Sequence, residues 1–211
     1  MIGIVGPSGC GKSSLAQTLS NRWGEAAVLF HEDPKFFKAV ASISYDDRDP
    51  SSEEPHHVDW DAYTLALLEV INQQNCEVVI VEHFLLLHDE RVVNQLNGLI
   101  FMDPGSDIDA AMWTFLERRV MRNPHRSPKE VFYLCKYYQT SVWPSYLKNS
   151  HDSATIFCTK CQCKEWSVDT MDASQKRALK VDCVQQSAAD IAGQVEKVVS
   201  QWQKEFPIEN V

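Results

Sequence analysis

The stretch GPSGCGKS at residues 6–13 decides which fold this chain adopts. It follows the apolar run MIGIV at 1–5 and leads into a segment with helical periodicity at 12–23. Its spacing, G-x-x-x-x-G-K-[ST], is typical of a loop that wraps a phosphate group between a strand and a helix. Glycines let the backbone curl until successive N–H groups face the phosphate oxygens, and the helix N-terminus adds a partial positive charge. The stretch therefore predicts a phosphate-binding loop.

Two side chains in this loop indicate a nucleoside triphosphate with a metal ion. Lys12 would bridge the β- and γ-phosphates as a catalytic cation, and the hydroxyl of Ser13 would bind Mg²⁺. An ordinary strand-to-helix turn is the alternative, and it needs neither residue at those two positions. The predicted nucleotide-binding residues of the loop are Gly6, Ser8, Gly9, Cys10, Gly11, Lys12, Ser13 and Ser14.

Apolar runs of strand length alternate along the chain with segments of helical periodicity. The expected strands are 1–5, 26–30, 76–87, 98–103 and 154–158. The expected helices are Lys12–Trp23, Asp61–Gln74, Asp107–Arg122, Pro128–Tyr138 and Ala188–Phe206. Uniformly apolar strands that alternate with helices are typical of a parallel sheet covered on both faces. We predict an α/β fold in one domain over residues 1–211, with a C-terminal covering helix at about 186–206.

Composition narrows the class of partner. Hydrophobic residues make up 44% of the 211 residues, as in ordinary globular proteins, and the formal net charge is −9. A broad nucleic-acid surface needs clustered Lys and Arg, and no run approaches the roughly 18 apolar residues of a membrane-spanning helix. The first residues also lack the pattern of a secretory leader. We expect small-molecule partners, no nucleic acid, no membrane and a cytoplasmic location; the oligomeric state is not predicted.

The seven cysteines show no disulfide-scaffold regularity, so we expect free thiols in a reducing compartment. Cys158, Cys161 and Cys163 lie close together, and a C-x-x-C pair can begin a zinc site. No second well-spaced pair of ligands follows, so we interpret this segment as a reduced loop.

Two carboxylates are expected at the same edge of the sheet as the phosphate-binding loop. Asp33 follows the apolar run at 26–30, and Glu82 follows the apolar residues 78–81. Open α/β sheets bind ligands at the carboxyl ends of their strands, where both residues fall. One would accept the proton of a hydroxyl group, and the other would bind Mg²⁺ directly or through water. The alternative is that both are solvated loop residues.

The basic segment ERRVMRNPHRSP at 117–128 is interpreted as a lid. On a helical wheel of 107–122, Arg119 and Arg122 continue the apolar inward stripe, and Arg118 lies at its edge. Cations over the phosphates would neutralise charge on the transferring group and help to exclude water. The alternative is that the arginines only stabilise the C-terminus of a helix.

Six segments occur in the order, and with about the spacing, of one enzyme family. They are IGIVGPSGCGKSSLAQTL, HEDPKFFK, VDWDAYTLAL, VVIVEHFLLL, ERRVMR and VWPSYLKN. Together they cover residues 1 to about 150, and VWPSYL at 142–147 is the most specific of them. On these residues the chain resembles the nicotinamide riboside kinase family, a branch of the uridine kinase-like P-loop kinases.

The resemblance implies a five-stranded parallel sheet, ATP as phosphoryl donor, Mg²⁺, and phosphorylation of nicotinamide riboside at its 5′-hydroxyl to give nicotinamide mononucleotide in NAD salvage. By position it implies that Asp33 is the base near that hydroxyl and that Glu82 is the metal-side carboxylate. Trp60 lies where the family has an aromatic ring against nicotinamide, and Asp61 where a carboxylate holds the ribose hydroxyls. The implied lid arginines, which contact nucleotide and substrate, are Arg118, Arg119 and Arg122.

Both acceptor-side residues suit a cationic base. A pyridinium ring prefers the electron-rich face of an indole, and a carboxylate accepts hydrogen bonds from two vicinal hydroxyls. The alternative is that Trp60 is a core aromatic and Asp61 an N-terminal cap of the helix at 61–74. The chain departs from the family pattern in three places: the inserted residue in Asp33-Pro34-Lys35-Phe36, His83 in place of glycine, and Asn123-Pro124 in place of a tyrosine-containing segment.

Three functions remain open from the sequence. They are a nicotinamide riboside kinase, a kinase of uridine, cytidine or another small metabolite, and a non-catalytic nucleotide-binding regulator. The acceptor pocket distinguishes the first two. The third is opposed by the joint presence of Lys12, Asp33, Glu82 and the lid arginines.

Overall fold

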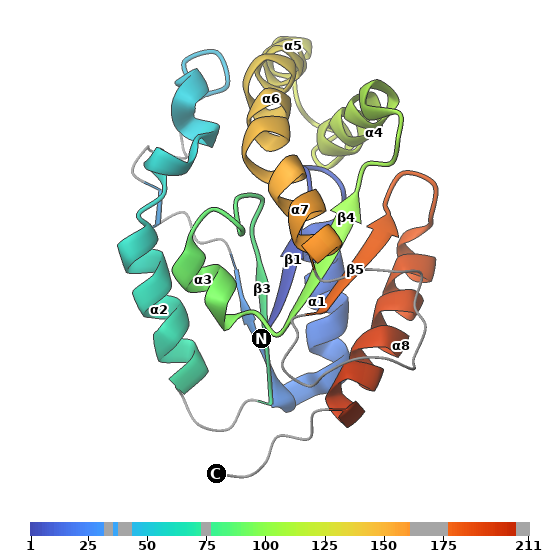
Figure 1. Cartoon of the computed structure of the whole chain (residues 1–211). Coiled ribbons are helices and arrows are strands. Elements are labelled where there is room, and N and C mark those ends of the chain that lie inside the picture. The colour runs from blue at the N-terminus through green and yellow to red at the C-terminus, as the bar shows by residue number, and fades with distance from the viewer. Residues whose placement is uncertain (32–35, 38–43, 73–76, 161–176, 206–211) are drawn as a thin grey trace.

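Five strands form the centre of the molecule in the computed structural model, which describes residues 1–31, 36–37, 44–72, 77–160 and 177–205. Neighbouring strands are parallel, in the order β2-β3-β1-β4-β5. The strands are β1 (Ile2–Val5), β2 (Ala27–Phe30), β3 (Val78–Glu82), β4 (Gly98–Asp103) and β5 (Arg177–Asp182). Helices cover both faces of the sheet (Figure 1), which confirms the predicted α/β fold.

The helices include all five that the sequence predicts, with ends that differ by at most two residues. They are α1 (Lys12–Trp23), α2 (Trp60–Asn72), α3 (Glu90–Gln95), α4 (Ile108–Met121), α5 (Pro128–Tyr137), α6 (Trp143–Tyr146), α7 (Asp152–Lys160) and α8 (Ala188–Glu205). The short helices α3 and α6 and the helix α7 were not predicted. Among the described residues, no helix combines the length and the apolar character needed to cross a membrane.

Side chains alternate across the strands and give the sheet two buried faces. Ile4 and Ile100 belong to the core that includes residues of α1 and α8. Val81, Leu99 and Phe101 belong to the core on the opposite face, which includes residues of α2, α3 and α7. The alternation continues to the end of β3, so it determines the face of the sheet on which Glu82, the last residue of β3, lies.

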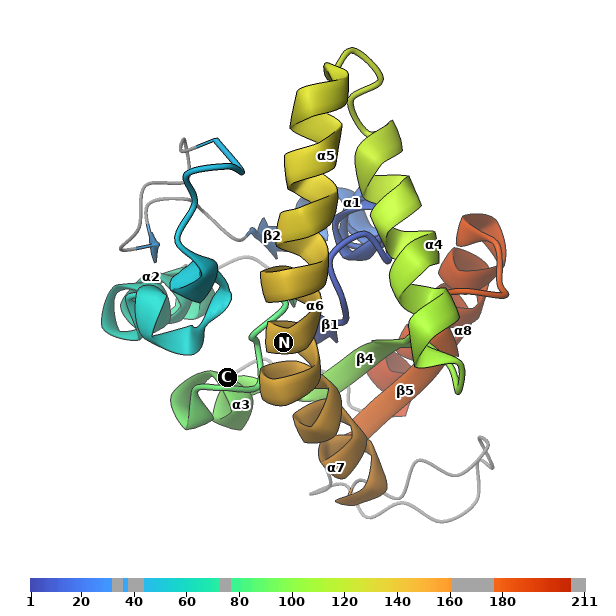
Figure 2. The same cartoon turned by 90° about the horizontal axis from the view of Figure 1, so that it is seen from above.

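A single long helix crosses the top of the sheet from residue 128 to residue 160 (Figure 2). Two π-helical turns, η5 (Tyr138–Val142) and η6 (Leu147–His151), interrupt it on either side of α6. Pro144 lacks an N–H group and its ring crowds the carbonyl one turn earlier, so the regular hydrogen-bond ladder cannot run through it. The N–H of Trp143 instead donates to the carbonyl of Tyr138, five residues earlier, which widens the turn.

One predicted strand is wrong, and another is too long: of the strand expected at 76–87, β3 covers Val78–Glu82, and residues 84–87 form a turn. Residues 154–158 lie in α7, where Ala154 is buried and Ile156 is 52% exposed, the uneven burial of a helix with one face on the core. The fifth strand is RALKVD at 177–182, which pairs with β4 along its whole length. Its charged residues Arg177, Lys180 and Asp182 interrupt the apolar ones, so it lacks the uniform apolar run that identified the other strands.

The segment at 44–57 packs against the long helix. It contains two short 3₁₀ helices, η3 (Pro50–Glu53) and η4 (Pro55–His57), and a further one, η1 (Gly24–Ala26), precedes β2. The backbone carbonyl of Glu53 accepts a hydrogen bond from Ser145 Oγ at 2.6 Å, and Glu54 Oε2 accepts one from Lys148 Nζ at 2.9 Å. These contacts hold the segment at 44–57, which leads toward the predicted acceptor-side residues Trp60 and Asp61, against the long helix.

Candidate active site

The phosphate-binding loop leaves β1, packs against α4 and enters α1. Gly9 and Gly11 have φ angles of 95° and 104°, in the left-handed region that strains residues with a Cβ atom. A Cβ atom on Gly9 would lie 2.4 Å from the carbonyl oxygen of Phe115 in α4. The loop therefore needs these glycines both for its curl and for its close approach to the helix that carries the arginines.

Lys12 is the first residue of α1, and its side chain folds back over the loop. The residue is only 8% exposed, and its Nζ donates to the carbonyl oxygen of Pro7 at 3.1 Å. The N-cap, Gly11, has no side chain to cap the first N–H groups of the helix. Ammonium and helix N-terminus thus present positive charge to the same curl, an arrangement that fits a phosphate. Ser13 and Ser14 follow, exposed in the first turn of α1.

Gly6 and Cys10 attach the loop to the end of β4. A Cβ atom on Gly6 would lie 2.8 Å from Cβ of Met102, and the thiol of Cys10 donates to Sδ of Met102 at 3.7 Å. Burial raises the pKa of Cys10, but a hydrogen bond with Cys183 and the nearby Lys12 ammonium lower it, to about 7 overall. Both residues therefore pack the loop against Met102 at the end of β4.

Glu82 lies beside the loop, as the sequence predicts. It is the last residue of β3, in register with Ile4 of β1, and is 4% exposed. Its Oε1 lies 3.6 Å from Nδ1 of His31 at the end of the neighbouring strand. A buried carboxylate at this edge has the donor chemistry that Mg²⁺ prefers. The other predicted carboxylate, Asp33, lies outside the described residues.

The lid arginines take three different positions. Arg119 Nη1 donates to the hydroxyl of Ser8 in the phosphate-binding loop, and its buried Nε has no hydrogen-bond partner among the described residues. Arg118 Nη1 donates to the carbonyl of Cys183 at 2.8 Å, on the far side of α4 from the segment at 44–57. Arg122 is exposed. Arg119 is thus the arginine already at the loop, with a donor that suits a phosphate oxygen.

Arg126 and the capping of α5 fix the turn between the two lid helices. Arg126 Nη1 donates to the carbonyls of Arg119 and Val120, both at 3.1 Å, and so caps the C-terminus of α4. Ser127 and Glu130 form a reciprocal capping box at the start of α5. The interpretation of 117–128 as a basic segment above the loop is consistent with these contacts.

Two neighbouring tyrosines, which the sequence analysis missed, join the loop to the acceptor side. The hydroxyl of Tyr138 donates to the carbonyl of Ser8 at 2.7 Å, and that of Tyr137 donates to Oε1 of Glu53 at 3.0 Å. Burial raises the pKa of both phenols well above its ordinary value, so both remain donors at neutral pH. Neither residue belongs to a recognisable motif, so no signal in the sequence identified these contacts.

The two predicted acceptor-side residues contact the protein itself. Trp60 donates from Nε1 to the carbonyl of Pro55 at 2.9 Å, and its ring centre lies 5.5 Å from those of Tyr63, His83 and His88. The Asp61 carboxylate is 88% exposed and lies 2.6 Å from Nη1 of Arg91. The N-terminal cap of α2 is not Asp61 but Asp59, the residue before the helix begins, whose Oδ1 accepts a hydrogen bond from the N–H of Ala62 at 3.1 Å.

His83, which stands where the family pattern has glycine, fills the space next to Glu82. It is 1% exposed, and its ring stacks on those of Phe37 and Phe84. Burial and the Lys12 ammonium lower its pKa to about 3, despite the opposing effect of Glu82. The ring is therefore neutral at physiological pH, with Nδ1 accepting from the N–H of Leu85 at 2.9 Å.

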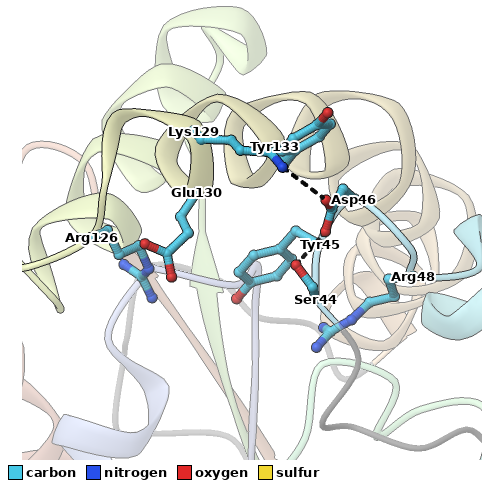
Figure 3. Close-up of a pocket in the computed structure, with 8 residues that line it drawn as sticks. All are labelled: Ser44, Tyr45, Asp46, Arg48, Arg126, Lys129, Glu130 and Tyr133. Carbon is cyan, nitrogen blue, oxygen red and sulfur yellow. Dashed lines mark hydrogen bonds and ion pairs between the residues drawn. The ribbon is translucent and has the colours of Figure 1, made fainter.

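A cavity of about 370 Å³ lies between the turn at 44–48 and the start of α5 (Figure 3). Tyr45 and Tyr133 contribute aromatic rings, and Arg48 and Lys129 contribute cationic groups. None of these residues has a role predicted from the sequence.

The prediction about the cysteines at 158–163 is untested, because Cys161 and Cys163 lie outside the described residues. Among the described residues, no cluster of His, Cys, Asp and Glu suits a metal ion.

The chain is similar in sequence to uridine kinases. One from Clostridium botulinum (strain 657 / Type Ba4) is 25% identical in an alignment 207 residues long that covers 85% of this chain and 97% of that protein. One from Oceanobacillus iheyensis is 24% identical in an alignment 171 residues long that covers 70% of this chain and 79% of that protein. One from Schizosaccharomyces pombe is 26% identical in an alignment 170 residues long that covers 69% of this chain but only 36% of that protein. No family model matches the chain.

Among solved structures, a gluconokinase from Sinorhizobium meliloti 1021 resembles this chain with a TM-score of 0.50 at 17% identity, over 100% of this chain and 97% of that one. The fold is that of the P-loop kinases. Together with the uridine kinase relatives, it supports a kinase of small metabolites that uses ATP as phosphoryl donor.

Proposed function

We propose that this P-loop kinase fold transfers the γ-phosphoryl group of ATP to the 5′-hydroxyl of a nucleoside. The observation that carries the proposal is the convergence of Lys12, Glu82 and Arg119 on one loop, from three different elements. A turn with incidental glycines would not need a buried ammonium, a buried carboxylate and an arginine at the same place.

In this proposal the chain's own groups bind and orient the phosphates. Backbone N–H groups of Gly9, Gly11 and their neighbours face the β-phosphate, and Lys12 exchanges the carbonyl of Pro7 for phosphate oxygens. Arg119 exchanges Ser8 for the transferring group, where its second donor also finds a partner. These groups are positioned before the reaction begins, so little reorganisation is needed during transfer.

The metal and proton roles complete the proposal. Ser13 and Glu82 would hold Mg²⁺, which when bound supplies positive charge to the phosphates. Asp33 would orient the acceptor hydroxyl and accept its proton as the new bond forms. Arg118 and Arg122 would contact the nucleotide. Arg118 already lies next to the residues that follow β5, where it donates to the carbonyl of Cys183.

Two acceptors are proposed, each on its own observation. Nicotinamide riboside, leading to NAD salvage, is supported by the six sequence segments and by VWPSYL in particular. A pyrimidine nucleoside is supported by the uridine kinase relatives, one of which matches over 97% of its length. For Asp61 to hold ribose hydroxyls, its carboxylate would first have to leave Arg91.

A nucleoside panel tests the proposal. Purified protein with Mg·ATP should release ADP with nicotinamide riboside or with uridine and cytidine, and mass spectrometry should find the matching 5′-monophosphate. Turnover of uridine at least as efficient as that of the riboside would assign the second acceptor and refute the first. ATP binding without ADP release for any nucleoside would identify the chain as a regulator instead.

A further inference from the structure

The cavity beside α5 is of the size that holds a nucleoside base. Its volume of about 370 Å³ falls within the roughly 300–1,000 Å³ typical of small-molecule sites. In Figure 3 the ring of Tyr45 lies between Glu130 on one side and Arg48 on the other, with Tyr133 above on α5. None of these residues belongs to the phosphate-binding loop or to the lid arginines assigned from the sequence.

Two chains of contacts connect this cavity with the phosphate-binding loop. Arg126, which lines the cavity, donates to the carbonyl of Arg119, and Arg119 donates to Ser8. On the other wall, the ring of Tyr45 lies 5.8 Å from that of Tyr137, next to Tyr138, which also donates to Ser8. The cavity is therefore linked to the phosphate-binding loop through Arg119 on one wall and through Tyr137 and Tyr138 on the other. It lies on the side of the segment at 44–57, which contributes part of its lining. Arg118 points to the opposite side, toward Cys183.

The lining combines aromatic rings with hydrogen-bond donors. Arg48 packs over Tyr45 at 4.8 Å, and the Lys129 ammonium lies 5.7 Å from the ring centre of Tyr133. Three cations and two carboxylates line the cavity, Arg48, Arg126, Lys129, Asp46 and Glu130, for a formal charge of +1. In a chain with a net charge of −9 this is a local reversal of sign, which favours a planar ring that carries carbonyl or carboxylate oxygens and disfavours the pyridinium cation of nicotinamide riboside. Of the two proposed acceptors, the cavity fits the pyrimidine nucleoside.

The acidic groups of the lining are already paired within the protein. Glu130 accepts from the N–H and the hydroxyl of Ser127, at 2.8 and 2.7 Å. Asp46 accepts from Ser44 and lies 3.9 Å from Lys129 Nζ. Both carboxylates of the lining therefore already have partners, and Lys129 is shared with Asp46.

Trp60, the base-binding residue expected from the sequence, is less well placed for this task. Its N–H is bound to Pro55, and three rings surround it. The carboxylate of its neighbour Asp61 is exposed and paired with Arg91. Neither residue lines the cavity.

Resting on the proposed nucleoside kinase activity, we propose that this cavity, rather than the face of Trp60, receives the base of the acceptor. The base packs against Tyr45 and Tyr133, and its carbonyl or carboxylate oxygens accept from Arg48 and Lys129. The ribose then extends toward the phosphate-binding loop, which brings the 5′-hydroxyl to the phosphates.

Matched aromatic variants on one helix test this assignment. Tyr133→Ala removes a ring of the cavity, Phe132→Ala removes the neighbouring ring, which is 63% exposed outside it, and Trp60→Ala removes the rival site. Nucleoside binding is measured by calorimetry without ATP, and KM for acceptor and for ATP by ADP release. Tyr133→Ala should weaken acceptor binding at least about fivefold, the lower end for loss of a base-stacking ring, and leave KM for ATP within twofold.

Charge variants give a second, independent measurement. Lys129→Met should raise the acceptor KM severalfold, because the ammonium lines the cavity, whereas Lys136→Met, exposed two turns along the same helix, should leave it unchanged. Lys129 is 74% exposed, so its replacement does not threaten folding.

The outcomes separate the two proposals. If Tyr133→Ala binds nucleosides as Phe132→Ala does, or if only Trp60→Ala weakens binding, the cavity assignment is overturned and the kinase activity stands. If nucleosides bind and Tyr133→Ala weakens their binding, but wild type releases no ADP, the cavity assignment stands and the kinase proposal fails. If no nucleoside binds to the wild-type protein, the cavity assignment fails.

Discussion

Replacement of Lys12 by alanine separates a catalytic loop from a structural turn. The ammonium is 8% exposed and donates to the carbonyl of Pro7 at 3.1 Å, and no carboxylate lies within ion-pair distance among the described residues. Lys12→Ala removes one hydrogen bond but also removes the cost of burying a charge, so stability should change by no more than about 1 kcal/mol. For a chain of this length that corresponds to about 2–4 °C in melting temperature.

The effect on turnover should be far larger. Loss of one preorganised electrostatic donor costs about 2.7–4 kcal/mol in the transition state, or roughly 10²–10³-fold in kcat. Steady-state ADP release and a thermal melt on the same preparation measure both quantities. Lys197→Ala, which removes an exposed ammonium on α8, is the control and should keep both values. Near-normal turnover of Lys12→Ala would refute the phosphate-binding role, and a melting temperature lowered by more than about 10 °C would show that the residue is structural.

Two further substitutions test the geometry elsewhere. Gly9→Ala forces a Cβ atom to within 2.4 Å of the Phe115 carbonyl at a φ of 95°, so it should abolish ATP binding in calorimetry, whereas Gly193→Ala, with open space around it, should raise the free energy of unfolding by about 0.5–1 kcal/mol. ATP binding by Gly9→Ala at wild-type affinity would contradict the loop geometry. Hydrogen bonds from Arg91 lower the pKa of Asp89, the N-cap of α3, so its stabilising effect is full above the unfolded pKa of about 3.9 and declines as the pH falls below it. Asp89→Asn should therefore lower the free energy of unfolding at pH 7 and differ less from wild type at pH 3 in urea titrations; an equal difference at both values would rule out the ionic contribution.

The features predicted most accurately are those that depend on local pattern. The loop at 6–13 needs glycines at positive φ and a lysine at the start of a helix, and those requirements are visible in eight consecutive residues. The strands β1, β3 and β4 are buried, and they are apolar up to the carboxylates that end β3 and β4; the edge strand β2 is apolar as well, so all four have a visible pattern. The other edge strand, β5, contains Arg177, Lys180 and Asp182, which break the apolar pattern and hid it.

The acceptor side depends on contacts between distant segments, and these were not visible in the sequence. Tyr45 and Tyr133, which are 88 residues apart in the sequence, line the same cavity because the segment at 44–57 folds onto α5, and no local pattern predicts that. Asp61 was assigned from its place in a motif, but Arg91, 30 residues away, takes its carboxylate. Residues whose partners are far apart in the chain need the tertiary structure before a role can be argued.

The number of residues in the long helix fixes the directions in which its side chains point relative to one another around the helix axis, and the two π-helical turns are part of that spacing. Each residue advances an α-helix by about 100°, so the deletion of one residue between Tyr138 and Ser150 would rotate the two ends against each other by about that angle. Tyr138 holds Ser8 of the phosphate-binding loop, and the hydroxyl of Ser150 holds the carbonyl of Phe84, just after β3. The two contacts cannot both be kept after such a rotation. The segment should therefore accept changes of side chain on its exposed face, but tolerate no change in its length.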